Sequence, residues 1–162
     1  MHAQSYNRLA EFAKKVPKHA VVLDVGAYDV NGNLRGLFGP KYIGFDIEKG
    51  PNVDIVEKEP FKIPLADASV DAVVSANSLE HVSMPWKLVL EMDRVLRPSG
   101  LLCISAAWAW GYHAYPTDCW RFSHDAYKVL FGEWMIENGR KSYVIVDNRI
   151  EGLDSFFEAI KP

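Results

Sequence analysis

The sequence predicts an α/β fold, a three-layer sandwich built around a mostly parallel sheet. Short, continuous apolar runs recur along the 162 residues, and strands buried on both faces of a sheet have this pattern. Segments with helical spacing of apolar residues lie between several of these runs, which is typical of parallel strands joined by right-handed crossovers. The length favours a single domain over residues 1–162.

The first half of the chain predicts one helix and four strands. Leu9, Phe12, Ala13 and Val16 recur at spacings of three and four, so residues 5–16 form an amphipathic helix that Pro17 ends. Six apolar runs along the whole chain predict strands, at residues 20–26, 42–47, 53–56, 70–75, 100–105 and 142–146.

Helices are expected around the fifth run and near the C-terminus. Ser83 can cap a helix that has Pro85 in its first turn and ends at Pro98-Ser99-Gly100. Another helix runs from about Ser123, its expected cap, to Trp134, and residues 153–160 suggest a last short helix. Only one late strand is then predicted, so the C-terminal strands are reduced.

Composition excludes several classes of protein. The net charge of −3 gives no basic patch for nucleic acid, and no apolar run approaches the 18 residues of a membrane span. The N-terminus lacks a signal-peptide core, and Cys103 and Cys119 form no disulfide framework, so we expect a cytoplasmic protein. The sequence leaves a homodimer open.

Acidic residues stand at the ends of the first two predicted strands. Ligands of parallel sheets bind at the carboxyl ends of the strands, where Asp24 could hold a cationic group and Gly26 lets a ligand approach the backbone. Asp46 suits a ribose diol. Each position alone could also be an ordinary turn or a solvated acid. The G-x-G-x-x-G pattern of dinucleotide sites is absent.

Five segments in order resemble the class I S-adenosylmethionine-dependent methyltransferases, a Rossmann-like family. They cover roughly residues 20–105, as Val21-Val22-Leu23-Asp24-Val25-Gly26, Tyr42-Ile43-Gly44-Phe45-Asp46, residues 63–75, Asn77-Ser78-Leu79-Glu80-His81-Val82 and Val95-Leu96-Arg97-Pro98-Ser99-Gly100-Leu101-Leu102. The resemblance implies S-adenosylmethionine as the cofactor.

The resemblance also implies a role for each matching residue. Asp24 and Gly26, with Ala27 and Tyr28 after them, would line the methionine end of the cofactor, and Asn77 would lie beside it. Asp46 and Ile47 would contact the ribose side. An acid facing the adenine would be Glu59, with Glu57 as the alternative. The implied cofactor-binding residues are therefore Asp24, Gly26, Ala27, Tyr28, Asp46, Ile47, Glu59 and Asn77.

Two departures from the family pattern affect this site. Tyr28 and Val30 occupy positions where the family usually has glycine, so the first loop is bulkier and Tyr28 could lie over the cofactor. Pro60 has no N–H group to offer the adenine ring, so Phe61 would supply it or the alignment shifts by one residue.

Residues 106–122 form an aromatic loop where this family usually holds its substrate. Tyr115, Asp118, Trp120 and Arg121 are the candidate substrate-binding residues, although Asp118 and Arg121 could instead form a structural ion pair and Trp120 could be core. The segment from Pro116 to Phe122 resembles one in small bacterial methyltransferases, some of which act on sugars or glycans.

Two histidines are candidates for general-base catalysis, because a hydroxyl acceptor must lose its proton. His113 is the first candidate and His81 the second, with a structural role for His81 as the alternative. His113, Asp118 and His124 lack the ligand spacing of a known metal site, so no metal is expected.

The sequence therefore predicts methyl transfer from S-adenosylmethionine to a small molecule, with a sugar or glycan hydroxyl as one candidate acceptor. The alternative is a non-catalytic cofactor-binding or scaffold module. A nucleotide-dependent oxidoreductase is disfavoured, because the glycine-rich fingerprint and a Tyr-x-x-x-Lys pair are both absent.

Overall fold

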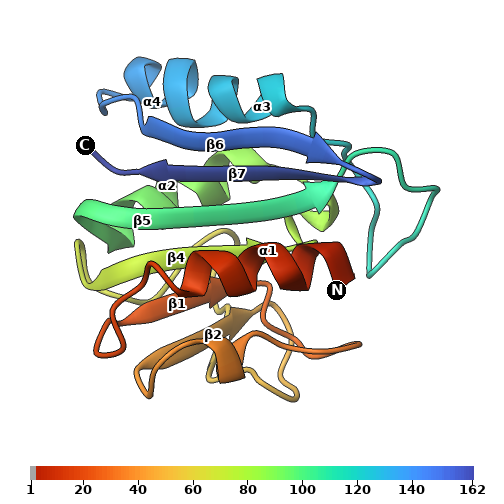
Figure 1. The fold of residues 1–162 in the computed structure, drawn as a ribbon, viewed down its shortest axis with the longest axis horizontal. Helices are drawn as coiled ribbons and strands as arrows, with labels where there is room; N and C mark the ends of the chain where they lie inside the picture. Colours follow the sequence, from red (N-terminus) through yellow and green to blue (C-terminus); the bar gives the residue numbers. More distant parts are fainter. Residues whose placement is uncertain (1–2) are drawn as a thin grey trace.

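A computed structural model describes residues 3–162 as a seven-stranded sheet covered by helices on both faces (Figure 1). The strand order is β3-β2-β1-β4-β5-β7-β6, and only the pairings of β7 with β5 and β6 are antiparallel. The strands are β1 (Val22–Val25), β2 (Tyr42–Asp46), β3 (Ile55–Val56), β4 (Val70–Ala76), β5 (Leu96–Ala107), β6 (Val144–Glu151) and β7 (Asp154–Ile160). The predicted three-layer, mostly parallel Rossmann-like fold is confirmed.

Neighbouring residues of the central strands face opposite sides of the sheet and enter two separate cores. Val22 and Val74 pack with Leu9 and Phe12 of helix α1 (Ala3–Ala13) on one face. Leu23 packs on the other face with α2 (Pro85–Val95), α3 (His124–Lys128), the π-helix η3 (Val129–Glu133) and α4 (Trp134–Glu137). The double-sided burial explains why the strand sequences are continuously apolar.

The C-terminal part of the chain differs from the prediction. Residues 153–160 do not form a helix, because β7 pairs with β5 along its whole length and buries both faces. The strand β6 is longer than expected, and Gly152, with φ of +60°, makes the tight turn that joins it to β7. The C-terminal hairpin is therefore present, and the predicted reduction is wrong.

Smaller differences concern element ends. Ser83 does not cap α2, whose N-cap is Met84 with no side-chain hydrogen bond, although Pro85 begins the helix as predicted. Ser123 does cap α3, because its side chain accepts from the backbone N–H of Ala126. Residues 98–100 already belong to β5. No helix within residues 3–162 is long and apolar enough to cross a membrane.

Candidate active site

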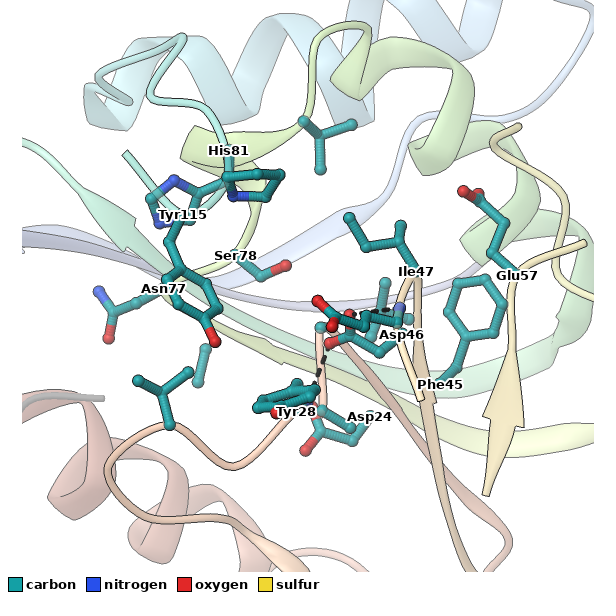
Figure 2. A pocket seen from close by; sticks show the side chains of 18 of the residues that line it. Asp24, Tyr28, Phe45, Asp46, Ile47, Glu57, Asn77, Ser78, His81 and Tyr115 are labelled. Atoms are coloured by element: carbon teal, nitrogen blue, oxygen red, sulfur yellow. Dashed lines mark hydrogen bonds between the residues drawn. The ribbon is translucent and has the colours of Figure 1, made fainter. Parts of the chain in front are cut away.

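A cavity of about 620 Å³ opens at the carboxyl ends of β1, β2 and β4. Its volume is within the range of about 300–1,000 Å³ that is typical of small-molecule sites. In Figure 2, Asp46, Ile47 and Glu57 lie on one side, and Asn77, His81 and Tyr115 on the other. The parallel topology thus brings together side chains that are far apart in the sequence.

The first loop reaches the cavity through a glycine that no other residue could replace without strain. Gly26 has φ of +85°, and a Cβ atom there would lie 2.0 Å from Oγ of Ser78. The N–H groups of Gly26 and Ala27 both donate to the carbonyl oxygen of Phe45, at 2.9 and 3.1 Å. The backbone after β1 is therefore held close against the ends of β2 and β4.

Asp24 is a buried acid in the cavity lining. The hydroxyl of Tyr42 donates to its Oδ2, whereas Oδ1 has no hydrogen-bond partner among the described residues. Burial raises the pKa of Asp24 to about 7, because the charged form loses its hydration. A cationic ligand group at this position would stabilise the carboxylate.

Asp46 lies at the end of β2 and also lines the cavity. Its Oδ2 accepts from the backbone N–H of Tyr28 at 2.9 Å (Figure 2), so the acid both orders the first loop and faces the ligand space. A Cβ atom on Gly50 would lie 2.2 Å from the Tyr28 ring, so the two residues are in close contact. The centroid of that ring is 6.4 Å from the centroid of the Tyr115 ring. The bulky first loop thus forms a wall of the cavity.

The acid beyond β3 that faces the cavity is Glu57 and not Glu59. Glu59 is exposed and does not line the cavity, whereas Glu57 does. Oε1 of Glu57 accepts from the N–H of Phe61 at 2.6 Å, and burial raises the pKa of Glu57. The alternative residue, Glu57, therefore replaces Glu59 as the acid that faces the cavity, because the turn at Pro60 and Phe61 directs Glu57 inward.

Asn77 follows β4 with a left-handed backbone, φ of 49°. Its side-chain amide donates to Oδ1 of Asp154 at 3.0 Å while the residue lines the cavity. Ser78 also lines the cavity, and the sequence analysis did not single it out. Its contact with Gly26 depends on two strand ends meeting, which no local pattern indicates.

The two candidate histidines lie together in the cavity wall. The centroids of the His81 and His113 rings are 5.1 Å apart, and the rings are nearly perpendicular. Nδ1 of His81 is 2.5 Å from the carbonyl oxygen of Thr117, and Nδ1 of His113 is 2.8 Å from that of Gly111. Burial lowers the pKa of His81. Both rings are thus oriented by backbone carbonyls, with Nε2 left for other contacts.

Of the four candidate substrate residues, Tyr115 lines the cavity, and Asp118, Trp120 and Arg121 lie outside its lining. Arg121 donates to both oxygens of Asp118, at 2.5 and 2.8 Å, and also to the carbonyl oxygens of Trp110 and Gly111. The hydrogen bonds from Arg121 hold the pKa of Asp118 well below its usual range. Nε1 of Trp120 donates to the carbonyl oxygen of Val82. These contacts fix the loop, as the alternative of a structural ion pair predicted for Asp118 and Arg121, whereas Trp120 is exposed and is not part of the core.

Glu80 is a further buried acid beside the histidines that the sequence analysis did not select. It is fully buried; its Oε1 accepts from the N–H of Ala107 at 3.2 Å, and Oε2 has no partner among the described residues. Burial raises its pKa to about 7. The feature of the sequence that could have indicated Glu80 was its position directly before the candidate His81.

Comparison with known proteins assigns the chain to a family. The family described as "Methyltransferase domain" matches residues 10–104, more than half of the chain. The chain belongs to this methyltransferase family. The match includes every acid of the cavity described above and ends before the aromatic loop.

Relatives of this methyltransferase domain agree with that assignment. An uncharacterized methyltransferase of Mycolicibacterium gilvum is 54% identical over an alignment of 102 positions, and the match covers 54% of this chain and 39% of that protein. An uncharacterized methyltransferase of Mycobacteroides abscessus is 46% identical over an alignment of 101 positions, and the match covers 52% of this chain and 38% of the relative. The chain thus matches about two fifths of the length of these relatives.

A solved structure shows the same fold. The chain superposes on a SAM dependent methyltransferase from Aquifex aeolicus with a TM-score of 0.69 and 18% identity, covering 100% of both chains. At this identity the likeness shows the fold of the methyltransferase domain, including the C-terminal hairpin region.

Proposed function

We propose that this chain transfers a methyl group from S-adenosylmethionine to a small molecule, with a sugar or glycan hydroxyl as the acceptor. The observation that carries the proposal is the arrangement of one cavity. Asp24, Asp46 and Glu57 face it from the first strand ends, and His81 and His113 line the other wall. The family match over residues 10–104 supports the same reaction.

The chemistry of the cavity fits this cofactor. Oδ1 of Asp24, which has no hydrogen-bond partner within residues 3–162, offers an acceptor to the ammonium group of the methionine part. Asp46 offers carboxylate oxygens to the ribose hydroxyls, and Glu57 offers an acceptor to the adenine amino group. The close approach at Gly26 leaves no room for a side chain between the first loop and Ser78.

S-adenosylmethionine, when bound, supplies a methyl group on a positively charged sulfur that an in-line nucleophile can displace. The protein's share of such a reaction is proximity and alignment of the two reactants. The three acids would fix the cofactor along the ends of β1 and β2. The acceptor would then lie between the cofactor and the wall formed by His81, His113 and Tyr115.

The histidines are our candidates for removing the acceptor's proton, His113 first and His81 second. Each has its Nδ1 beside a backbone carbonyl, which orients Nε2 for another contact. The half-exposed Tyr115 ring offers an aromatic face to a sugar. Residues 116–122 resemble a segment of small bacterial methyltransferases, some of which act on sugars or glycans, and this resemblance supports that acceptor class.

Calorimetry with S-adenosylmethionine, S-adenosylhomocysteine and NAD tests the cofactor. We expect binding of both sulfur compounds and none of NAD, and binding of neither sulfur compound would overturn the proposal. A screen of sugar and glycan acceptors for transfer of a labelled methyl group tests the reaction. Cofactor binding without transfer to any acceptor would favour a non-catalytic module.

A further inference from the structure

Glu80, His81 and His113 form a cluster that includes none of the three acids proposed to bind the cofactor. Each offers one ligand atom, and these atoms all lie within 4.8 Å of one another. The short helix η2 (Leu79–His81) follows β4, and the loop after β5 brings His113 against it. Two neighbouring strand ends therefore supply two imidazoles and one carboxylate at the cavity wall.

The hydrogen bonds of the two rings leave the same nitrogen available on each. Thr117 and Gly111 present carbonyl oxygens, which only accept, so Nδ1 of each ring carries the proton. Nε2 then holds the lone pair. Metal-binding histidines commonly donate their second ring N–H to a backbone carbonyl or carboxylate, which fixes the tautomer and the ring orientation.

The two carboxylate oxygens of Glu80 differ in the same way as the two nitrogens of each imidazole ring. Oε1 accepts from the N–H of Ala107, while Oε2 is buried without a hydrogen-bond partner among residues 3–162. A buried carboxylate oxygen without a partner is costly, and a bound cation is one of the few groups that offsets the cost. Each of the three side chains thus has one atom fixed by the backbone and one atom left over.

We propose that Nε2 of His81, Nε2 of His113 and Oε2 of Glu80 bind a divalent transition metal ion, with zinc preferred. Two imidazoles and one carboxylate form a known catalytic zinc ligand set, which leaves a further position for water or substrate. Both histidines line the cavity, so the open position faces the ligand space. The sequence-based expectation of no metal considered His113 together with Asp118 and His124. In the structure both carboxylate oxygens of Asp118 accept from Arg121, so Asp118 is not part of the cluster.

A catalytic consequence follows, and it rests on the proposed methyl transfer. With the ion bound, the histidines act as metal ligands and not as the proton acceptor, because their Nε2 lone pairs are bound to the metal. An acceptor hydroxyl bound at the open position would release its proton to solvent more readily, because the cation lowers its pKa. A lone pair of that oxygen then forms the bond to the methyl carbon. The carbon–sulfur bond breaks, and its electrons stay on sulfur as a neutral thioether. The metal ion keeps its oxidation state.

Cobalt binding tests the site without any acceptor. Tag-free protein covering the whole chain, stripped with EDTA, is titrated with Co²⁺ and followed by visible absorption, and Zn²⁺ is then added in competition. We expect one ion per chain and displacement by Zn²⁺. Glu80→Gln, His81→Gln and His113→Gln should each weaken Co²⁺ binding by more than ~10-fold.

Matched controls separate this site from binding at the surface. His19→Gln and His124→Gln remove exposed histidines outside the cluster and should bind Co²⁺ as the wild type does. Equal Co²⁺ affinity in the wild type and the three cluster variants would overturn the proposal, as would the absence of binding. Calorimetry with S-adenosylhomocysteine on the same samples shows whether each variant is folded. Cofactor binding without cobalt binding would refute the metal site and leave the proposed function standing.

Discussion

Asp24 and Asp118 are both shielded acids beside loops at the same edge of the sheet, yet their surroundings are opposite. Asp24 receives one hydrogen bond from Tyr42, has no partner for Oδ1 in the described part of the chain, and has its pKa raised by burial to about 7. Asp118 receives two hydrogen bonds from Arg121 and one from the N–H of His113, which hold its pKa well below the usual range.

The difference separates positions for ligands from positions for scaffold. An acid whose acceptor atoms are all used within the chain has nothing left to offer a substrate. An acid with an unused, buried oxygen beside a cavity carries a cost that a ligand can offset. By this criterion Asp24 and Glu80 belong to binding sites, while Asp118 and Arg121 hold the aromatic loop in place.

The largest expected effect is a change in the pH dependence of stability, for Asp24→Asn in the cofactor-free protein. The folded pKa of Asp24 lies above its ordinary value of 3.8, so the folded state binds more protons than the unfolded state between about pH 4 and 7. Stability contributed by this group therefore falls as pH rises through that window. The shift from 3.8 to about 7 sets an upper limit of ~4 kcal/mol for the loss.

Urea unfolding from pH 4 to 8 checks this prediction. The wild type should lose stability toward pH 8, and Asp24→Asn should lose less. Part of the slope remains in the variant, because burial also raises the pKa values of Glu57 and Glu80. Asp67→Asn, at an exposed acid, serves as the control. Parallel curves for wild type and Asp24→Asn would remove the distinction between the two aspartates.

The next largest effect concerns Asp46. Replacing it with alanine removes the acceptor that we propose for the ribose hydroxyls and the acceptor for the N–H of Tyr28. We expect S-adenosylhomocysteine to bind ~100-fold more weakly, which corresponds to about 3 kcal/mol for hydrogen bonds to a charged group. Calorimetry measures the change, and Asp67→Ala should bind as the wild type does. An unchanged affinity would place the ribose elsewhere in the cavity.

Glu57 and Glu59 provide a smaller and sharper test. Glu57→Gln should weaken cofactor binding by ~10-fold, because it replaces a charged acceptor facing the cavity with a neutral one. Glu59→Gln should leave the affinity unchanged, since Glu59 is exposed and outside the cavity lining. The ratio of the two dissociation constants is the readout. The reverse ratio would restore the sequence-based assignment.

The sequence predicted which strand ends form one side of the cavity, because strand ends follow from apolar runs. The positions of Asp24 and Asp46 at neighbouring strand ends required only the parallel topology, which gathers those ends at one edge. The same reasoning could not separate Glu57 from Glu59, because the choice depends on the local turn at Pro60 and Phe61. The β6–β7 hairpin was missed because its turn at Gly152 and Leu153 is very short, and because the second half of β6, with Asp147, Asn148 and Arg149, has no apolar run that would predict a strand.

The aromatic loop was less predictable for a physical reason. Its conformation is set by contacts to other segments, such as Trp120 to the carbonyl oxygen of Val82 and Thr117 to that of His81. Residue types alone do not reveal which side chains such contacts turn away from the cavity. The grouping of Glu80 with His113 likewise depends on two strand ends meeting.

The smallest effect on the cofactor is expected for Arg121→Lys. Lysine keeps the positive charge but cannot reproduce the forked bonds to Asp118 or the bonds to the carbonyl oxygens of Trp110 and Gly111. We expect the unfolding temperature to fall by ~2–4 °C, the effect of losing about one good hydrogen bond. Binding of S-adenosylhomocysteine should stay within ~2-fold, since a change that small is under 1 kcal/mol. A large loss of cofactor affinity with no change in unfolding temperature would instead place Arg121 among the binding residues, and the contrast between the two aspartates would then fail as a guide to function.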